Sequence, residues 1–176
     1  EKPLPIYDDE TEGDYNQRVC VDNPQRFALL DKKNIKITGA ASVVEPCDLY
    51  DKDKEFIHVK RYSGSSVLSH LFNQGLVSGE LFQMSVEYRE VLNSKLPKDF
   101  SIAESDNRPK PNEYKVVFAI ISESDADLSI PFFSKISIRH VTNRLEAIGF
   151  NVLVAKVSVA ELRKKTKKYA ASKQKI

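Results

Sequence analysis

Apolar and polar positions recur along the chain with two different periods, and the period changes several times. Short apolar or alternating runs predict strands at 26–31, 42–51, 55–62, 114–122 and 151–159. Apolar residues at helical spacing predict helices over 10–21, from 65 to 96, and over 130–150. The predicted order is therefore one helix, three strands, a helix, a strand, a helix and a final strand.

This order predicts an α/β fold with a mixed central sheet. Three successive strands joined by short polar turns favour an antiparallel meander, and the later alternation of strands and helices favours parallel crossovers. The most apolar strand, 114–122, is the candidate for the central position in the sheet. Gly75 and Gly79 are expected to interrupt or bend the long helix.

With 176 residues the chain has the length of one domain. We expect a lead-in over 1–9, one α/β domain over 10–160, and a basic helix or tail over 161–176. The first residue is not Met, which suggests a piece of a longer polypeptide.

Composition limits the classes of protein that the chain can represent. Hydrophobic residues make up 41% and charged residues 30%, which is ordinary for a soluble globular protein. No run approaches 18 apolar residues, so no membrane span is expected. Cys20 and Cys47 match no metal-binding spacing and predict free thiols in the reducing cytoplasm. The net charge of +2 identifies no partner, although the basic end of the chain permits a contact with nucleic acid.

Candidate chemistry gathers around the predicted hairpin of the strands 42–51 and 55–62. Asp48 lies near the end of the first of these strands, and His58 and Lys60 share one face of the second by the period of two. If the hairpin closes near residue 52, the three side chains converge on one face. Glu45 is expected to alternate away from Asp48 in a regular strand. A carboxylate that holds a metal, beside a lysine that orients water, suits phosphodiester hydrolysis.

A small turn and a helix follow this hairpin. The turn Gly64–Ser65–Ser66 offers backbone N–H groups that suit a phosphate, and Ser65 is expected to cap the helix. His70 and Gln74 share a helix face at i and i+4. Together with Arg61, these residues are predicted to contact the backbone of a nucleic acid.

These residues resemble the signature of the PD-(D/E)XK nuclease superfamily. Its core is α-β-β-β-α-β, with an acid in or near the first helix, an Asp at the end of the second strand and (Asp/Glu)-x-Lys on the third. The matching positions here are Glu10, Glu12 or Asp14 for the helix acid, Asp48 in "EPCD", Lys60 in "HVK", and Gln74 on the following helix. The resemblance implies a restriction-endonuclease-like core, extended here by a further helix and strand.

A second resemblance covers roughly residues 14–160. The stretches "CDLYDKDKEFIHVKRYSGSSVLSHLFNQGLVSGELF" and "IPFFSKISIR" are similar to the C-terminal region of a "sporadically distributed" family of bacterial proteins. The scattered occurrence of that family implies mobile or defence-associated genes. The resemblance therefore implies a role in bacterial defence, within a longer protein that either acts alone or forms oligomers.

His58 departs from the superfamily signature, because it occupies the position of the usual acid before x-Lys. Mg²⁺ prefers oxygen ligands, so an imidazole at this position favours Mn²⁺ or another metal. The implied ligands are the Asp48 carboxylate, the Val59 carbonyl and Glu12, with His58 as a further ligand or proton acceptor.

The expected function is metal-dependent hydrolysis of DNA. The alternative keeps the fold without the chemistry, as a catalytically inactive module that binds nucleic acid or supports assembly. A third reading is a domain with a purely structural or protein-interaction role.

Overall fold

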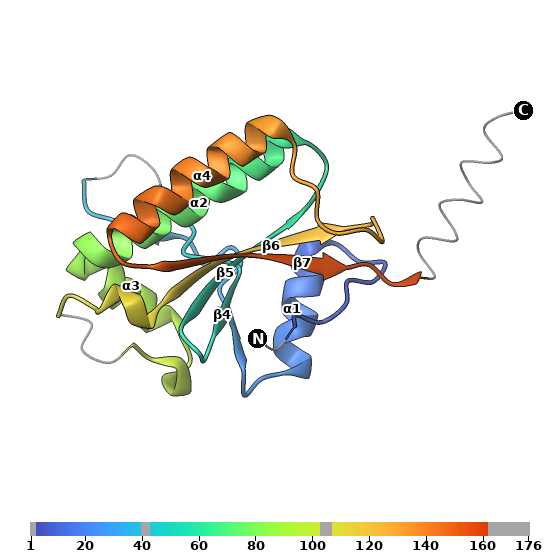
Figure 1. Ribbon diagram of the computed structural model, residues 1–176. Helices are drawn as coiled ribbons and strands as arrows, with labels where there is room; N and C mark the ends of the chain where they lie inside the picture. Colours follow the sequence, from blue (N-terminus) through green and yellow to red (C-terminus); the bar gives the residue numbers. More distant parts are fainter. Residues whose placement is uncertain (1–2, 40–42, 103–106, 162–176) are drawn as a thin grey trace, which may run out of the picture.

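The computed structural model describes residues 3–39, 43–102 and 107–161, and shows a layered α/β arrangement (Figure 1). The four helices of the described ranges are α1 (Glu12–Asp22), α2 (Ser65–Met84), α3 (Val86–Lys95) and α4 (Phe132–Ala147). The strands are β1 (Phe27–Leu29), β2 (Ile35–Lys36), β3 (Val43–Val44), β4 (Leu49–Asp51), β5 (Glu55–Arg61), β6 (Lys115–Ser122) and β7 (Asn151–Ser158). Two 3₁₀ turns, Lys98–Phe100 and Pro111–Glu113, lie between α3 and β6.

The central sheet has the strand order β1-β4-β5-β6-β7. The pairs β1–β4 and β4–β5 are antiparallel, and the pairs β5–β6 and β6–β7 are parallel. This topology confirms the predicted mixed sheet, in which an antiparallel meander precedes two parallel crossovers. The strand at 114–122 was expected at the centre, and β6 does lie inside the sheet, although β5 is the middle strand.

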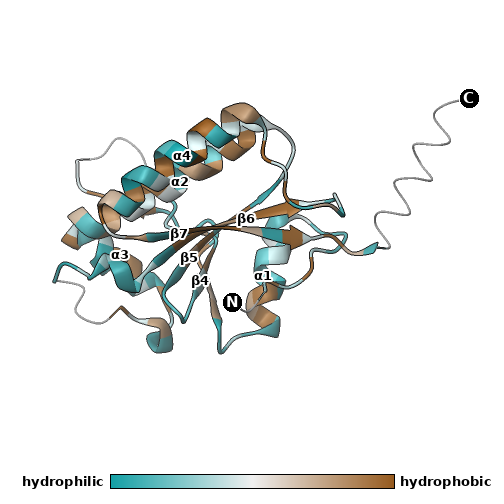
Figure 2. Cartoon of the chain, in the orientation of Figure 1, coloured by the Kyte–Doolittle hydropathy of each residue, from teal (hydrophilic) through white to brown (hydrophobic). Residues whose placement is uncertain are grey.

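Helices cover both faces of this sheet. The helices α2 and α4 lie side by side on one face, and α1 lies on the other (Figure 1). The strands between them are mostly apolar, whereas the outer surfaces of the helices carry many hydrophilic residues (Figure 2). The two apolar clusters follow the alternation of β5: Phe56 packs toward α2 and α4, and Ile57 and Val59 pack in the cluster that includes residues of α1.

The predicted strand 42–51 is wrong as one continuous element. Val43–Val44 pairs with β2 in a separate two-stranded sheet, and β4 begins only at Leu49. Pro46 lies between the two short strands, and its ring nitrogen has no hydrogen to donate to a ladder. Asp48 therefore precedes its strand in the central sheet and does not end it.

The long helix ends at a different residue from the one expected. It runs uninterrupted through Gly75 and Gly79 and stops at Ser85, whose extended backbone separates α2 from α3. The Ser85 hydroxyl accepts a hydrogen bond from the backbone N–H of Tyr88 and thereby caps α3. The glycines serve packing, because a Cβ at residue 75 would lie 2.5 Å from a ring carbon of Phe118.

The segment 1–9, predicted as a lead-in, contributes Tyr7 to the core and to the central sheet. Tyr7 is buried, and it forms a parallel bridge with Val159 beyond the end of β7. The backbone N–H of Tyr7 donates to Ser158, and that of Ala160 donates to Tyr7, both at 2.9 Å. The predicted basic helix or tail over 161–176 lies almost wholly outside the described residues.

Two other expectations from composition can be compared with the structure. Cys47 is buried, Cys20 is half-buried, and both are free thiols. Within the described ranges, no helix combines the length and the apolar character that crossing a membrane requires.

The contact between α2 and β6 gives a test of the fold. Gly75→Ala should lower the free energy of unfolding by about 1–3 kcal/mol, because the added methyl would lie within 2.8 Å of two ring carbons of Phe118, which is fully buried. Chemical denaturation measures this change, with Asn73→Ala on the exposed side of the same helix as the control. Equal or higher stability of Gly75→Ala would contradict the close packing.

Candidate functional site

The candidate site lies at the edge of β5 that continues past the beginning of β4. Pairing with β4 covers residues 55–57 of β5, so the following residues pair with no strand of the described chain on that side. Two carboxylates take the place of the missing strand. Asp48 Oδ2 accepts a hydrogen bond from the Val59 N–H at 2.6 Å, and Glu12 Oε1 accepts one from the Arg61 N–H at 3.1 Å. Both are hydrogen bonds to ionisable acceptors, which are stronger than neutral ones when the carboxylate is charged.

Glu12 also binds the lysine of the "HVK" motif. Lys60 Nζ lies 2.7 Å from Glu12 Oε2, and both side chains are about one-third exposed. Burial lowers the pKa of Lys60, but the hydrogen bond to Glu12 and the nearby Asp48 and Glu45 carboxylates raise it, and the net shift is upward. Lys60 therefore stays a cation in this site.

The structure separates the three acids proposed near the first helix. Glu12 is the one that reaches Lys60, because the N-terminus of α1 points this first-turn residue at the end of β5. Glu10 pairs instead with Arg18 at 2.6 Å. Asp14 completes a capping box with Thr11, in which each side chain bonds the other residue's backbone N–H.

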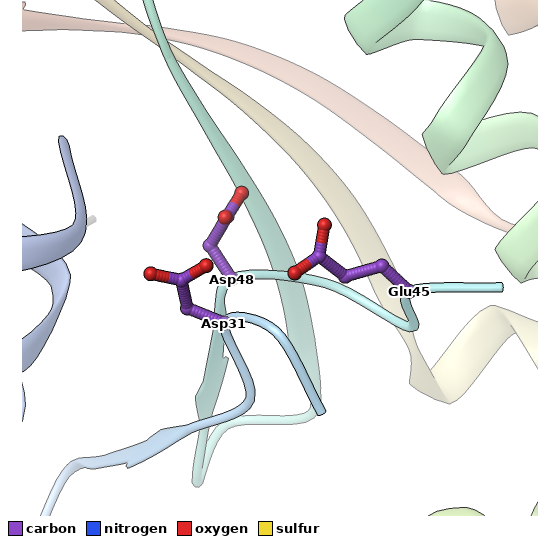
Figure 3. A group of neighbouring side chains, drawn as sticks. All are labelled: Asp31, Glu45 and Asp48. Atoms are coloured by element: carbon purple, nitrogen blue, oxygen red, sulfur yellow. The ribbon is translucent and has the colours of Figure 1, made fainter. Parts of the chain in front are cut away.

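Three carboxylates gather beside this pair. One oxygen each from Asp31, Glu45 and Asp48 lies within 4.8 Å of the other two, and all three residues are half-buried (Figure 3). Asp31 follows β1, and the other two lie in the segment that joins β3 to β4. The expectation that Glu45 points away from Asp48 is wrong, because the chain between them is not a regular strand.

Backbone hydrogen bonds hold this cluster together. The Asp48 carbonyl accepts from the N–H groups of both Leu30 and Asp31 at 2.9 Å, which brings the end of β1 against Asp48. The backbone N–H of Lys32 donates to the Glu45 carboxylate. From α2, the Ser78 hydroxyl donates to the carbonyl of Pro46 and fixes the segment between the two acids.

These groups line one open cleft of about 730 Å³. Its charged residues are five acids and three bases. They are Glu10, Glu12, Asp31, Glu45, Asp48, Lys32, Lys60 and Arg61. The excess of acids means that an anionic ligand enters this cleft favourably only together with a cation.

The electrostatics of the cleft act most strongly on Asp48. The pKa of this carboxyl is raised to about 7, chiefly by burial and also by the Glu45 and Asp31 carboxylates, while the Val59 N–H and Lys60 oppose the rise. Asp48 therefore titrates near neutral pH in the protein without a bound cation.

The prediction that His58 converges with Asp48 and Lys60 is wrong. His58 is 3% exposed, and its ring lies 5.9 Å from that of Phe118 in the core beneath α2 and α4. Burial lowers its pKa to about 4, so the imidazole is neutral. Its Nε2 has no hydrogen-bond partner among the described residues. His58 is thus a core residue here and reaches neither the cleft nor a ligand in it.

The small turn after β5 is also placed differently. Gly64 is the N-terminal cap residue of α2, so Ser65 is not the cap. The Ser65 hydroxyl lies 2.7 Å from that of Ser134 at the start of α4. Gly64, Ser65 and Ser66 do not line the cleft, and their predicted contact with phosphate remains a prediction.

Other predicted residues do border the cleft. Gln74 lines it, and with Glu45 it also lines an adjoining hollow that contains exposed His70. Arg61 lies at the opposite boundary and pairs with Glu123 at 2.6 Å. Val59, whose carbonyl is a predicted ligand, lines the cleft as well.

Sequence reasoning did not identify Asp31, Glu45 or Asn16 as parts of this site. Asp31 ends the apolar run "RFALLD" directly before a turn, which is a signal that an acid lies at a sheet edge. Pro46 is a sequence signal that the strand containing Glu45 is interrupted. Asn16 lies on the inner side of α1, and nothing in its sequence context distinguishes it.

Comparison with known proteins identifies the family. The chain belongs to DUF6119, a family of unknown function whose model matches residues 1–158 and so spans the fold from α1 to β7. No curated protein and no solved structure matches the chain significantly. The chemistry of the cleft is therefore the basis for a functional proposal.

The buried imidazole predicts a dependence of stability on pH. The folded pKa of His58 is about 4 and the ordinary value is 6.5, so the unfolded chain gains a proton first as the pH falls. Between about pH 7.5 and about pH 5, the wild type should lose about 2 kcal/mol more stability than His58→Leu. Urea denaturation across this range measures the difference, and equal losses would contradict a buried, neutral His58.

Asp48 predicts the opposite trend. Its folded pKa of about 7 lies above the ordinary 3.8, so its stabilising contribution is present below about pH 4 and is lost as the pH rises to 7. In Asp48→Asn the side chain stays neutral, and its oxygen can still accept from the Val59 N–H. Without divalent cations, this variant should exceed the wild type by on the order of 2 kcal/mol at about pH 8, and by much less at about pH 4.5. A constant difference across this range, measured by thermal unfolding, would contradict the raised pKa.

Proposed function

We propose that this domain is nuclease-like and catalyses metal-dependent hydrolysis of phosphodiester bonds in DNA. The observation that carries the proposal is the meeting of Asp48, Lys60 and Glu12 in one cleft. Residues from three separate segments supply a half-buried carboxylate, a cation and an acid that orients this cation. A phosphodiester reaction uses the same combination, because negative charge develops on the phosphoryl oxygens.

The topology supports the same proposal. One helix, an antiparallel meander, a helical crossover and a parallel strand follow in the order that the nuclease superfamily uses. We assign α1, β1, β4, β5, α2 and β6 to a restriction-endonuclease-like core. The β2–β3 hairpin is then an insertion before the second core strand, and α3, α4 and β7 are additions to the core.

The donor set of the cleft fits Mg²⁺ or Mn²⁺. Carboxylate oxygens are the ligands that these hard cations prefer, and Asp48 and its neighbours supply several of them. A bound cation would supply Lewis-acid chemistry at a phosphoryl oxygen and would lower the pKa of a bound water. The acidic excess of the cleft would hold such a cation.

The roles of the protein side chains follow from their positions. Lys60 orients the attacking water and stabilises negative charge, and Glu12 holds the lysine ammonium at the end of β5. Asp48 is fixed by the Val59 N–H, so its remaining oxygen can face a cation. Arg61, Gln74 and His70 border the cleft and the hollows next to it, where a nucleic-acid backbone would pass.

Cleavage assays test this function. The purified protein is incubated with plasmid and single-stranded DNA in Mg²⁺ or Mn²⁺, alongside Lys60→Met. Loss of the ammonium should reduce the cleavage rate by about 100-fold or more, as happens when a stabilising group is removed from other active sites.

The matched control for Lys60→Met is Lys115→Met. Lys115 also lies on a strand, and its Nζ forms an ion pair with Glu55 at 2.7 Å. Its side chain is nearly as exposed as that of Lys60 (33% against 34%), but it lies outside the cleft. This control should cleave at the wild-type rate. Salt-sensitive DNA binding with no cleavage in either metal would replace hydrolysis by the inactive, nucleic-acid-binding alternative.

A further inference from the structure

The geometry points to a divalent-cation site formed by Asp31, Glu45, Asp48 and the side-chain amide of Asn16. This inference rests on the proposed function and changes the set of cation ligands that the resemblance implies. Only Asp48 is common to both sets. Three of the four residues correspond to no position of the superfamily signature.

The spacing of the carboxylates suits a single cation. The three oxygens lie within 4.8 Å of one another. Hard divalent cations bind oxygen at about 2.1–2.4 Å, so oxygens on opposite sides of one ion are about 4.2–4.8 Å apart. Three oxygens no more than 4.8 Å apart lie within about 2.8 Å of one common centre, so small rotations of the side chains bring all three to the distance at which a hard cation binds oxygen.

In the described part of the chain, no direct ion pair neutralises the charges of this cluster. Among the described residues, no lysine, arginine or histidine forms an ion pair with Asp31, Glu45 or Asp48. Two lysines line the cleft: Lys60 is paired with Glu12, and Lys32 forms no ion pair with the three acids. Half-buried carboxylates at this distance repel one another, and a divalent cation removes that repulsion.

Asn16 gives an independent indication of a ligand. Its side chain is 1% exposed, it lines the same cleft, and its Oδ1 has no hydrogen-bond partner among the described residues. Its Nδ2 is 3.4 Å from Asp48 Oδ1, which is long for a hydrogen bond to a carboxylate. A buried amide with such weak partners is uncommon, because leaving it unpaired costs free energy.

A cation explains this amide. A half-turn about the last side-chain bond of Asn16 exchanges Oδ1 and Nδ2 and sets two oxygens 3.4 Å apart. Neighbouring ligands of one octahedral ion are separated by about 3.0–3.4 Å. Asn16 and Asp48 can therefore bind the same ion from α1 and from the segment before β4.

The other candidate ligands are less available. Both oxygens of Glu12 are occupied, one by Lys60 Nζ and the other by the Arg61 N–H. His58 lies in the core. By contrast, Glu45 and Asp48 are each held through one oxygen by a backbone N–H, which leaves the second oxygen for a cation. Glu45 and Asp31 thus supply the carboxylates that replace the acid expected at position 58, which is His58 in this chain.

Direct cation binding tests this inference without nucleic acid. Mn²⁺ is titrated into the protein, and binding is measured by calorimetry and by the loss of the free Mn²⁺ electron paramagnetic resonance signal. The wild type should bind one Mn²⁺ saturably, with Mg²⁺ competing. Asp31→Asn and Glu45→Gln, both nearly isosteric, should each raise the Kd at least about 10-fold, because removal of even a group that supports a metal ligand costs about that much affinity.

Two further variants complete the test: one controls for the loss of a negative charge, and the other tests the Asn16 amide. Glu113→Gln removes a carboxylate outside the cleft and should bind Mn²⁺ like the wild type. Asn16→Leu removes both amide atoms and should weaken Mn²⁺ binding. Each variant is checked for a wild-type circular dichroism spectrum and cooperative unfolding. Asn16→Leu, if it does not fold, is replaced by Asn16→Ser.

The outcomes separate this inference from the proposed function. Saturable Mn²⁺ binding that depends on Asp31 and Glu45 supports the site, even if the protein cleaves no DNA. No saturable binding, or an unchanged Kd in both Asp31→Asn and Glu45→Gln, overturns it. Metal-dependent cleavage with an unchanged Kd in those two variants would keep the proposed function and reject only this set of ligands.

Discussion

The candidate site depends on the exposed backbone edge of β5. This strand is seven residues long, and β4 beside it has three. Past the first residue of β4, the N–H groups of Val59 and Arg61 need acceptors, because unpaired backbone donors that are withdrawn from water are costly. Asp48 and Glu12 satisfy them. A structural requirement of the sheet therefore places two acids, and between them Lys60, at one position.

The same edge brings three carboxylates together at a place where no ion pair among the described residues neutralises them. The broken strand around Pro46 and the end of β1 bring Glu45 and Asp31 against Asp48. The polar contact of Ser78 with Pro46 ties this segment to α2, which packs on the core. The result is a rigidly supported group of carboxylates with little compensating charge, an arrangement more suited to binding a cation than to stabilising the fold.

His58 shows why a sequence signature and a site need not coincide. The period of two places His58 on the same face of β5 as Phe56, and that face is covered by α2 and α4. Lys60, two residues further on, lies at the end of the strand, where its long side chain can reach around to Glu12. Position along the strand, and not the face alone, decides which of the two residues enters the cleft.

Much of the fold was predictable from local patterns. The helix α1, the strands β5, β6 and β7, and the helix α4 follow from hydrophobic periodicity, and the mixed topology follows from the order of the elements. Gly75 was misread because its role is tertiary: it allows the ring of Phe118 to lie against α2. Such a contact leaves no local trace in the sequence.

By itself, the sequence determined most of the elements and the closeness of Asp48 and Lys60 across one hairpin, because both depend on interactions between residues close in the chain. The tertiary structure alone decided the rest of the site. In the folded chain, Glu12 is the one of three candidate acids that pairs with Lys60, and His58 lies in the core. Asp31, Glu45 and Asn16 lie around Asp48. These outcomes depend on where β4 begins and on how α1 and α2 pack against the sheet, and such long-range contacts are not encoded in any single stretch of sequence.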